Sequence, residues 1–401
     1  MKTALLRDAR LLLFCLSAIF ALRGTQNLTI SLYPFDGGGA DLLPIWLGAR
    51  ALVQGLDPCD PGVLSAEFST ADLNVRVGGF LSYYPPTASL FMMPFAEMPF
   101  RWVSSAFRVL LAIGLALSAW CCATAGRPRD ALSTWTATFA LIGVFFTVQP
   151  LLGGLEAGQP NPLIVFATAA ALAGLARGRD TAAGLIAALG VSLKLFPLIL
   201  VPAALRRPRF LVAGGALLLG MVLVVAAKAP LESLTSWPAR VLGFVGHPRD
   251  ANGFPNATLL VKTLLMQRLS GLGIATLAIA AVSLRGPSTP TRTVATGGVL
   301  VAWGGAVMGP NPQYHESLVL LPAIGLLLSL PALQGSLRLA WGLAIATAAT
   351  LYWGDAFATG RPGGNLNWLW IGYAIWALSV VRWGFAMWED TYGARKDVDE
   401  R

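Results

Sequence analysis

The chain has 401 residues, of which 55% are hydrophobic and 12% are charged, and this leaves too little polar surface for a water-soluble globular protein of that size. The formal net charge of +9 comes largely from Arg residues grouped in short clusters between apolar runs. Such clusters are typical topology signals of membrane proteins, so nucleic acid is not expected as a partner. Mean hydropathy is +0.64, and long apolar runs recur along the whole sequence, which predicts an all-α polytopic membrane protein.

The apolar runs predict about ten to twelve membrane helices, because a bilayer core asks for roughly 20 helical residues. The first run follows a basic N-terminus, and no convincing small-residue cleavage site follows it, so an uncleaved first helix is predicted rather than a signal peptide. The candidate segments in chain order are 11–32, 81–98, 102–124, 131–152, 159–176, 181–205, 208–228, 269–285, 293–309, 316–331, 337–354 and 367–386.

Two of these segments do not read as simple spans. The segment 81–98 contains Pro85, Pro86 and Pro94, and the segment 181–205 carries Lys194 and Pro197 in its middle. A lysine at mid-membrane costs about 2.5–3.5 kcal/mol on insertion scales. Two half-helices that meet near one membrane face avoid this cost, so both segments are expected to be broken or re-entrant.

This arrangement also brings the basic clusters to one side of the membrane, which the positive-inside rule identifies as the cytoplasmic side. The sequence then predicts a single transmembrane catalytic domain over 1–388, a large first extracytoplasmic loop over 33–80 and a cytoplasmic tail over 389–401. The predicted location is a bacterial inner membrane, with the chemistry facing the periplasm or the cell exterior. The clusters in question are Arg7/Arg10, Arg127/Arg129, Arg177/Arg179, Arg206/Arg207/Arg209, Arg285/Arg292, Arg338 and Arg382.

The first outer loop carries the candidate catalytic acid. Asp41 precedes an amphipathic segment, 42–54, which is expected to lie as a helix along the membrane surface. A carboxylate at this boundary could act as general base toward an acceptor hydroxyl, or simply cap the helix, and the two interpretations are compatible. Arg50 on the same segment could pair with a phosphate or anchor the helix at the interface.

Three polar or aromatic residues at the same membrane face are candidate sugar or acceptor contacts. Tyr84 precedes a rigid Pro-Pro step and could stack on a sugar, although tyrosines at this depth are usually interfacial belt residues. Gln159 and Asn161 open a predicted span and could hydrogen-bond sugar hydroxyls. The alternative for both amides is a structural bond between helices.

Besides Arg50, three further residues are candidate phosphate ligands. Lys194 is an intramembrane cation at a helix break, and such residues are functional candidates by default, although its long side chain could instead snorkel to the interface. His315 begins an apolar span at the same face, and Arg361 lies in a late outer loop. One histidine beside Glu316 is too little for a zinc site built by the protein alone, so no metal site is predicted.

These pieces together resemble the polyprenyl-phosphate-sugar-dependent glycosyltransferases of the C-type superfamily, and most closely glycosyltransferase family 87, the bacterial mannosyltransferase-like group. Each motif is short, and the ordered set spans most of the chain. Two features depart from the family pattern: Ile45 and Trp46 stand where members often carry Tyr, and His315 has no paired histidine. The stretches that carry the resemblance are 41–61, 84–86, 158–161, 192–197 and, less closely, 311–322.

The resemblance implies a C-type glycosyltransferase fold and inverting transfer of a hexose, with mannose as the family-level expectation, from a polyprenyl-phosphate donor to a lipid or glycan acceptor. It implies that Asp41 is the catalytic base and that Lys194 and His315 surround the donor phosphate. No cofactor is implied, and a divalent cation that bridges the phosphate is optional. The alternative is a transporter or flippase of a lipid-linked saccharide, which should show internal symmetry that the sequence lacks.

Overall fold

The chain is described by a computed structural model, in which α- and 3-10 helices are the regular elements of the described residues. These residues are 2–32, 39, 41–71, 73, 84–124, 131–146, 154–246, 279 and 289–308. The expectation of an all-α fold is therefore confirmed for this part of the chain.

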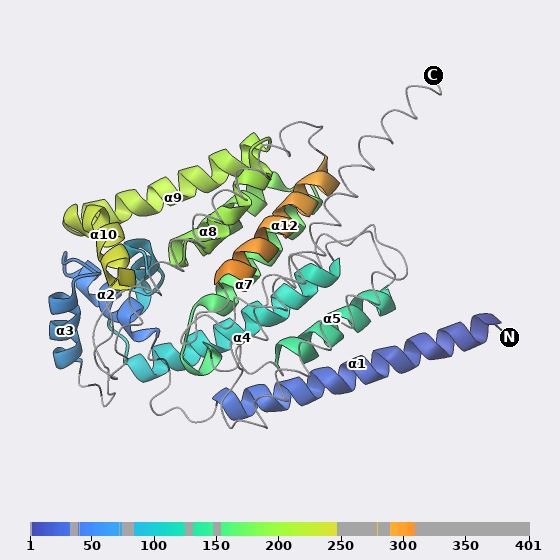
Figure 1. Ribbon diagram of the computed structural model, residues 1–401. Coiled ribbons are helices and arrows are strands. Elements are labelled where there is room, and N and C mark those ends of the chain that lie inside the picture. Colours follow the sequence, from blue (N-terminus) through green and yellow to red (C-terminus); the bar gives the residue numbers. More distant parts are fainter. Residues whose placement is uncertain are drawn as a thin grey trace, which may run out of the picture.

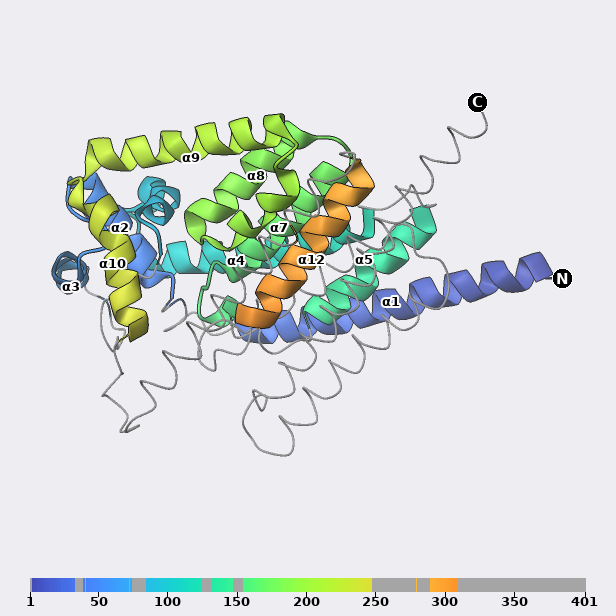
Figure 2. The same ribbon diagram turned by 45° about the horizontal axis from the view of Figure 1, so that its top comes forward.

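Seven long helices of the described part of the chain run roughly along one direction and form the body of the protein (Figure 1). Three further helices, α2 (Leu43–Val53), α3 (Pro61–Thr70) and α10 (Glu232–Gly246), gather at one end of this body, far from the N-terminus (Figure 2). The long helices are α1 (Lys2–Leu32), α4 (Phe100–Thr124), α5 (Ala131–Phe145), α7 (Asn161–Ala176), α8 (Asp180–Leu193), α9 (Pro208–Lys228) and α12 (Pro290–Met308).

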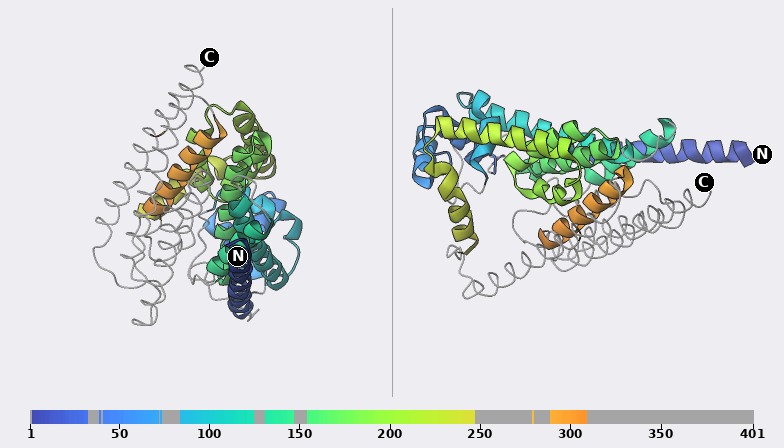
Figure 3. Two further views of the ribbon diagram at one scale, coloured as in Figure 1. Left: turned by 90° about the vertical axis from the view of Figure 1, so that its right-hand side faces the viewer. Right: turned by 90° about the horizontal axis from the view of Figure 1, so that it is seen from above.

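The long helices pack in a continuous series. Helix α1 packs on α5, α5 on α4, α4 on α7, α7 on α8 and α8 on α9, while α12 covers α7 (Figure 3). The α8–α9 crossing is close because Gly184 lies directly against the backbone of Phe210, where a larger side chain would not fit. Small residues at helix crossings are the usual means of close packing in membrane proteins.

The outward faces of the peripheral helices are apolar. Leu219 and Leu223 of α9 are 59% and 58% exposed, and Ile19 and Leu22 of α1 are 62% and 65% exposed. Among the described residues, α4 and α9 are the two helices whose length and composition suit a membrane span. Apolar faces of this extent are stable in contact with lipid, not with water.

Both interruptions predicted from the sequence are confirmed. The region 84–99 contains two 3-10 helices, η1 (Pro86–Phe91) and η2 (Met93–Phe95), instead of a span. Helix α8 ends at Leu193, Lys194 is extended, and η3 (Phe196–Leu200) and η4 (Pro202–Ala204) follow. Proline within each 3-10 helix removes a backbone donor, which explains why no α-helix continues through these regions.

The segment 42–54 forms the expected helix, α2, but this helix is buried within the protein and does not have the expected exposed polar face. Eight of the eleven residues of α2 are buried, and Trp46, at 2% exposed, lies in the main hydrophobic core. The reason is that α2 is apolar on nearly every side, with Arg50 as its one charged residue, and a helix of this kind is stable inside a core.

Basic residues collect at the end of the body opposite to α2. Arg177, after α7, donates from Nη2 to the main-chain oxygen of Thr124 at 2.6 Å, and Arg207, before α9, lies 3.6 Å from Asp180. Since α7 and α8 form an antiparallel hairpin, Asn161 and Lys194 lie together at the other end. The predicted spans 316–331, 337–354 and 367–386, the tail 389–401 and nearly all of 269–285 lie outside the described residues.

Candidate active site

Two loops that are distant in sequence pair through their backbones at the end of the body near α2. The main-chain nitrogen of Gly39 donates to the oxygen of Glu156 at 3.0 Å, and that of Asp41 donates to Ala157 at 2.9 Å. Gly158 has φ +69° and lies against Gly39, so close that a Cβ at position 158 would be 2.9 Å from the Gly39 Cα. A glycine is needed here for both reasons, and its presence brings Asp41 next to the start of α7.

A chain of side-chain hydrogen bonds connects the predicted acid with the predicted intramembrane cation. Asp41 Oδ2 accepts from Gln159 Nε2 at 2.5 Å, and Gln159 Oε1 accepts from Asn161 Nδ2 at 2.8 Å. Asn161 Oδ1 in turn accepts from Lys194 Nζ at 2.9 Å. The structure thus brings four of the predicted site residues together, although they come from segments up to 153 positions apart.

The capping alternative for Asp41 does not match the geometry. The N-cap position of α2 is Leu42, which makes no side-chain capping bond, and Pro44 occupies the first turn. The Asp41 carboxylate instead points to Gln159.

Tyr84 belongs to the same site. It lies in the non-helical segment before η1, and burial, followed by the negative charge of Asp41, raises the pKa of its hydroxyl well above the usual value. The hydroxyl therefore stays protonated. Asp41 also interacts electrostatically with Lys194, so one carboxylate connects both side chains.

The end of α8 is held against η1 next to this chain of bonds. Thr87 Oγ1 donates to the main-chain oxygen of Ser192 at 2.9 Å, and both residues are buried. The carbonyls of the last helical turn lack partners within the helix, so this bond stabilises the end of α8. The position of Lys194, two residues later, is fixed as a consequence.

Arg50 has a different environment from the one expected of a phosphate ligand. Its Nε lies 2.9 Å from Glu67 Oε2, and its guanidinium stacks 5.2 Å above the ring centre of Trp46. Gln54 donates to the other oxygen of Glu67 at 2.7 Å. These contacts hold α2 to α3, which is a structural role.

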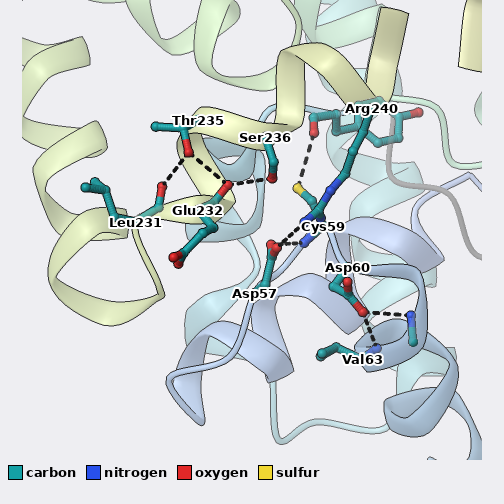
Figure 4. Close-up of polar contacts among 11 residues, drawn as sticks. Asp57, Cys59, Asp60, Val63, Leu231, Glu232, Thr235, Ser236 and Arg240 are labelled. Carbon is teal, nitrogen blue, oxygen red and sulfur yellow. Dashed lines mark hydrogen bonds and ion pairs between the residues drawn. The ribbon is translucent and has the colours of Figure 1, made fainter. Parts of the chain in front are cut away.

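The two aspartates of the first loop are structural, in agreement with the prolines beside them. Asp60 caps α3 by accepting from the main-chain nitrogens of Gly62 and Val63 at 2.8 and 3.0 Å. Asp57 accepts from the nitrogen of Cys59 at 2.9 Å and forms an ion pair of 2.9 Å with Arg240 of α10 (Figure 4). The ion pair attaches α10 to the loop that leads into α3.

Sequence reasoning missed one buried cation near the site. Arg108 of α4 is 2% exposed and interacts electrostatically with Glu156, whose main-chain oxygen binds Gly39. Ser104, one helical turn earlier, contacts Gly39 directly. The signal was present in the sequence, because Arg108 is a charged residue inside an apolar run, like Lys194.

Two predicted phosphate ligands, His315 and Arg361, lie outside the described residues. Within the described part of the chain, no three His, Cys, Asp or Glu side chains gather as a metal site would require.

A family model for glycosyltransferase family 87 matches residues 80–328. The match includes Tyr84, Gln159, Asn161 and Lys194, whereas Asp41 precedes it and is linked to it through the hydrogen bond from Gln159. Neither the comparison with curated proteins nor the comparison with solved structures gave a match. The family match covers more than half of the sequence, and the chain therefore belongs to glycosyltransferase family 87, a family of membrane glycosyltransferases.

Proposed function

We propose that this membrane glycosyltransferase moves a hexose, with mannose as the working hypothesis, from polyprenyl phosphate to a lipid or glycan acceptor with inversion at the anomeric carbon. The observation that carries the proposal is the chain of hydrogen bonds from Asp41 to Lys194. It gives one site an acid–base group and a cation, which are the two groups that this reaction needs.

Asp41 is the proposed general base. The acceptor oxygen attacks the anomeric carbon, the bond from that carbon to the phosphate oxygen breaks, and the acceptor proton passes to the Asp41 carboxylate. A single displacement of this kind inverts the anomeric configuration. General base catalysis contributes about 10²- to 10⁴-fold in rate.

Lys194 is the proposed ligand of the donor phosphate. Its ammonium group is a donor at the end of the chain of hydrogen bonds, where it donates to Asn161 Oδ1. Negative charge grows on the phosphate as the sugar leaves, and a fixed cation in a site of low dielectric constant stabilises it more than water does. We extend this proposal to His315 and Arg361, and we do not extend it to Arg50, whose guanidinium is engaged by Glu67. The proposal requires no resident cofactor, and it is compatible with a divalent cation that bridges the phosphate.

The proposed site faces the periplasm or the cell exterior of a bacterial inner membrane. Support comes from the end of the body that carries Arg177 and Arg207, because basic clusters favour the cytoplasmic side. Asp41 and Lys194 belong to the opposite end, where the head group of a lipid-borne donor meets water. Tyr84, beside Asp41, is the proposed aromatic contact for the sugar or the acceptor.

The donor class is tested by comparing two radiolabelled donors in membranes with and without the protein. Transfer of mannose from polyprenyl-phosphate-mannose, but not from a nucleotide-linked mannose, is the expected result. Transfer from the nucleotide donor in membranes free of polyprenyl phosphate would contradict the proposal.

A further inference from the structure

We propose that Gln159 and Asn161 are positioning residues, which hold the Asp41 carboxylate and the Lys194 ammonium in a fixed relative geometry and do not bind the sugar. This inference rests on the proposed roles of Asp41 and Lys194. It departs from the sequence-based expectation that the two amides contact the sugar or the acceptor.

The burial of Asn161 is the first observation. Asn161 is 1% exposed, so its side chain does not reach a substrate. Its two polar atoms already have partners within the protein, namely Gln159 for Nδ2 and Lys194 for Oδ1. A buried polar group with both ends satisfied is typical of a structural connector.

The direction of the bonds is the second observation. The ionised carboxylate of Asp41 can only accept, and the ammonium of Lys194 can only donate. The amide nitrogen of Gln159 must therefore face Asp41, the amide oxygen of Asn161 must face Lys194, and the two amides then pair donor to acceptor. Flipping either amide would break two bonds at once. Residues with one donor end and one acceptor end are thus needed at both positions.

Backbone anchoring is the third observation. The main-chain nitrogen of Gln159 donates to Gly154 at 2.8 Å, and Asn161 begins α7. The same loop binds the backbone of Asp41 through Ala157. The amides are therefore carried by a supported turn, as a device that orients catalytic groups requires.

The two amides should affect different steps of the reaction. Gln159→Leu removes the donor that orients Asp41 and leaves Lys194 with Asn161. Asn161→Asp places a carboxylate beside Lys194, which then competes with the donor phosphate for the ammonium.

The test uses the purified full-length protein, with Thr168→Val as the matched control. Thr168 is a buried polar residue of the same helix whose hydroxyl donates within that helix, to the oxygen of Ile164. Binding is measured with polyprenyl phosphate and with polyprenyl-phosphate-mannose, and turnover is measured in membranes. We expect Gln159→Leu to lower kcat about tenfold or more and to leave binding of both lipids near the wild-type level. We expect Asn161→Asp to weaken binding of both lipids by about tenfold.

A sugar-dependent result would overturn the inference. If either variant bound polyprenyl phosphate normally and lost affinity for the mannose-bearing lipid alone, the amide would be a sugar ligand. A different result would contradict the proposed function itself, namely that the wild-type protein binds neither of the two lipids.

A second measurement tests the inference without any sugar donor. Gln159→Leu and Lys194→Met are combined in a double-mutant cycle of Tm. The chain of bonds predicts that the two shifts in Tm are not additive, although Asn161 separates the two side chains. Additive shifts would overturn the inference regardless of the substrate.

Discussion

The carboxylate of Asp41 and the ammonium of Lys194 are joined by three consecutive hydrogen bonds that pass through the side chains of Gln159 and Asn161. This relationship connects the loop before α2 with the end of α8, and no segment of the sequence contains it by itself. It turns two residues that looked like separate candidates into parts of one site.

Lys194→Met should weaken the binding of polyprenyl phosphate, because it removes a charged donor to the phosphate and leaves the buried Asn161 oxygen without this partner. A hydrogen bond to a charged group is worth about 1.5–3 kcal/mol, which corresponds to roughly 10- to 100-fold in affinity. Lys194→Arg keeps the charge and should retain part of the binding. Equal loss in both variants, measured by equilibrium binding to purified protein, would contradict a role of the charge.

Gly158→Ala should lower transfer by about 10- to 100-fold, because the new methyl group pushes the Asp41 loop away from Gln159. Gly178→Ala is the matched control: Gly178 has φ +68°, nearly the φ of Gly158, but no atom lies within 4 Å of the place that a Cβ would occupy there. Both variants carry the cost of a left-handed conformation, about 1–2 kcal/mol, and should show a lower Tm. If transfer falls equally in both, the contact between Gly158 and Gly39 has no special part in positioning Asp41.

Arg50→Met should lower the Tm and leave polyprenyl phosphate binding unchanged, since the guanidinium is engaged by Glu67 and Trp46. Glu67→Gln should show a similar loss of Tm, because it removes the other half of the ion pair. If Arg50→Met bound polyprenyl phosphate more weakly while Glu67→Gln bound it normally, Arg50 would be a phosphate ligand after all.

The ion pair between Arg240 and Asp57 should contribute about 1 kcal/mol or less, because Arg240 is 33% exposed and water screens the interaction. Asp57→Ala should cost more than Arg240→Ala, since Asp57 also accepts from the nitrogen of Cys59. A double-mutant cycle of Tm at low and high salt measures the coupling. A coupling that does not fall as salt rises would contradict an ionic contact exposed to water.

The residue types within each segment were enough to predict the two helix interruptions. The prolines of 81–98 and the pair Lys194 and Pro197 identified two interrupted segments, because their effects on an α-helix depend on neighbouring residues alone. Contacts between segments that are distant in the sequence could not be predicted in this way. Asp41 and Gln159 are 118 positions apart, and a single sequence gives no information on such a pairing.

The other differences between the structure and the sequence-based expectations have physical causes as well. The segment 42–54 is expected to be an amphipathic helix, whereas its nearly uniform apolar character favours the buried helix that α2 is. The ion pair between Arg50 and Glu67 could not be predicted, because Glu67 lies on α3, a separate helix. Arg108 was overlooked although the argument applied to Lys194 applies to it equally.

Transfer of radiolabelled mannose from polyprenyl-phosphate-mannose by Asp41→Asn is the most direct test of the central claim. The substitution keeps the shape of the side chain and removes its basicity, so transfer should fall by about 10²- to 10⁴-fold while expression and polyprenyl phosphate binding stay normal. Transfer at the wild-type rate by Asp41→Asn would contradict the account, because the geometry around Gln159 and Lys194 would then hold a carboxylate that takes no part in the reaction.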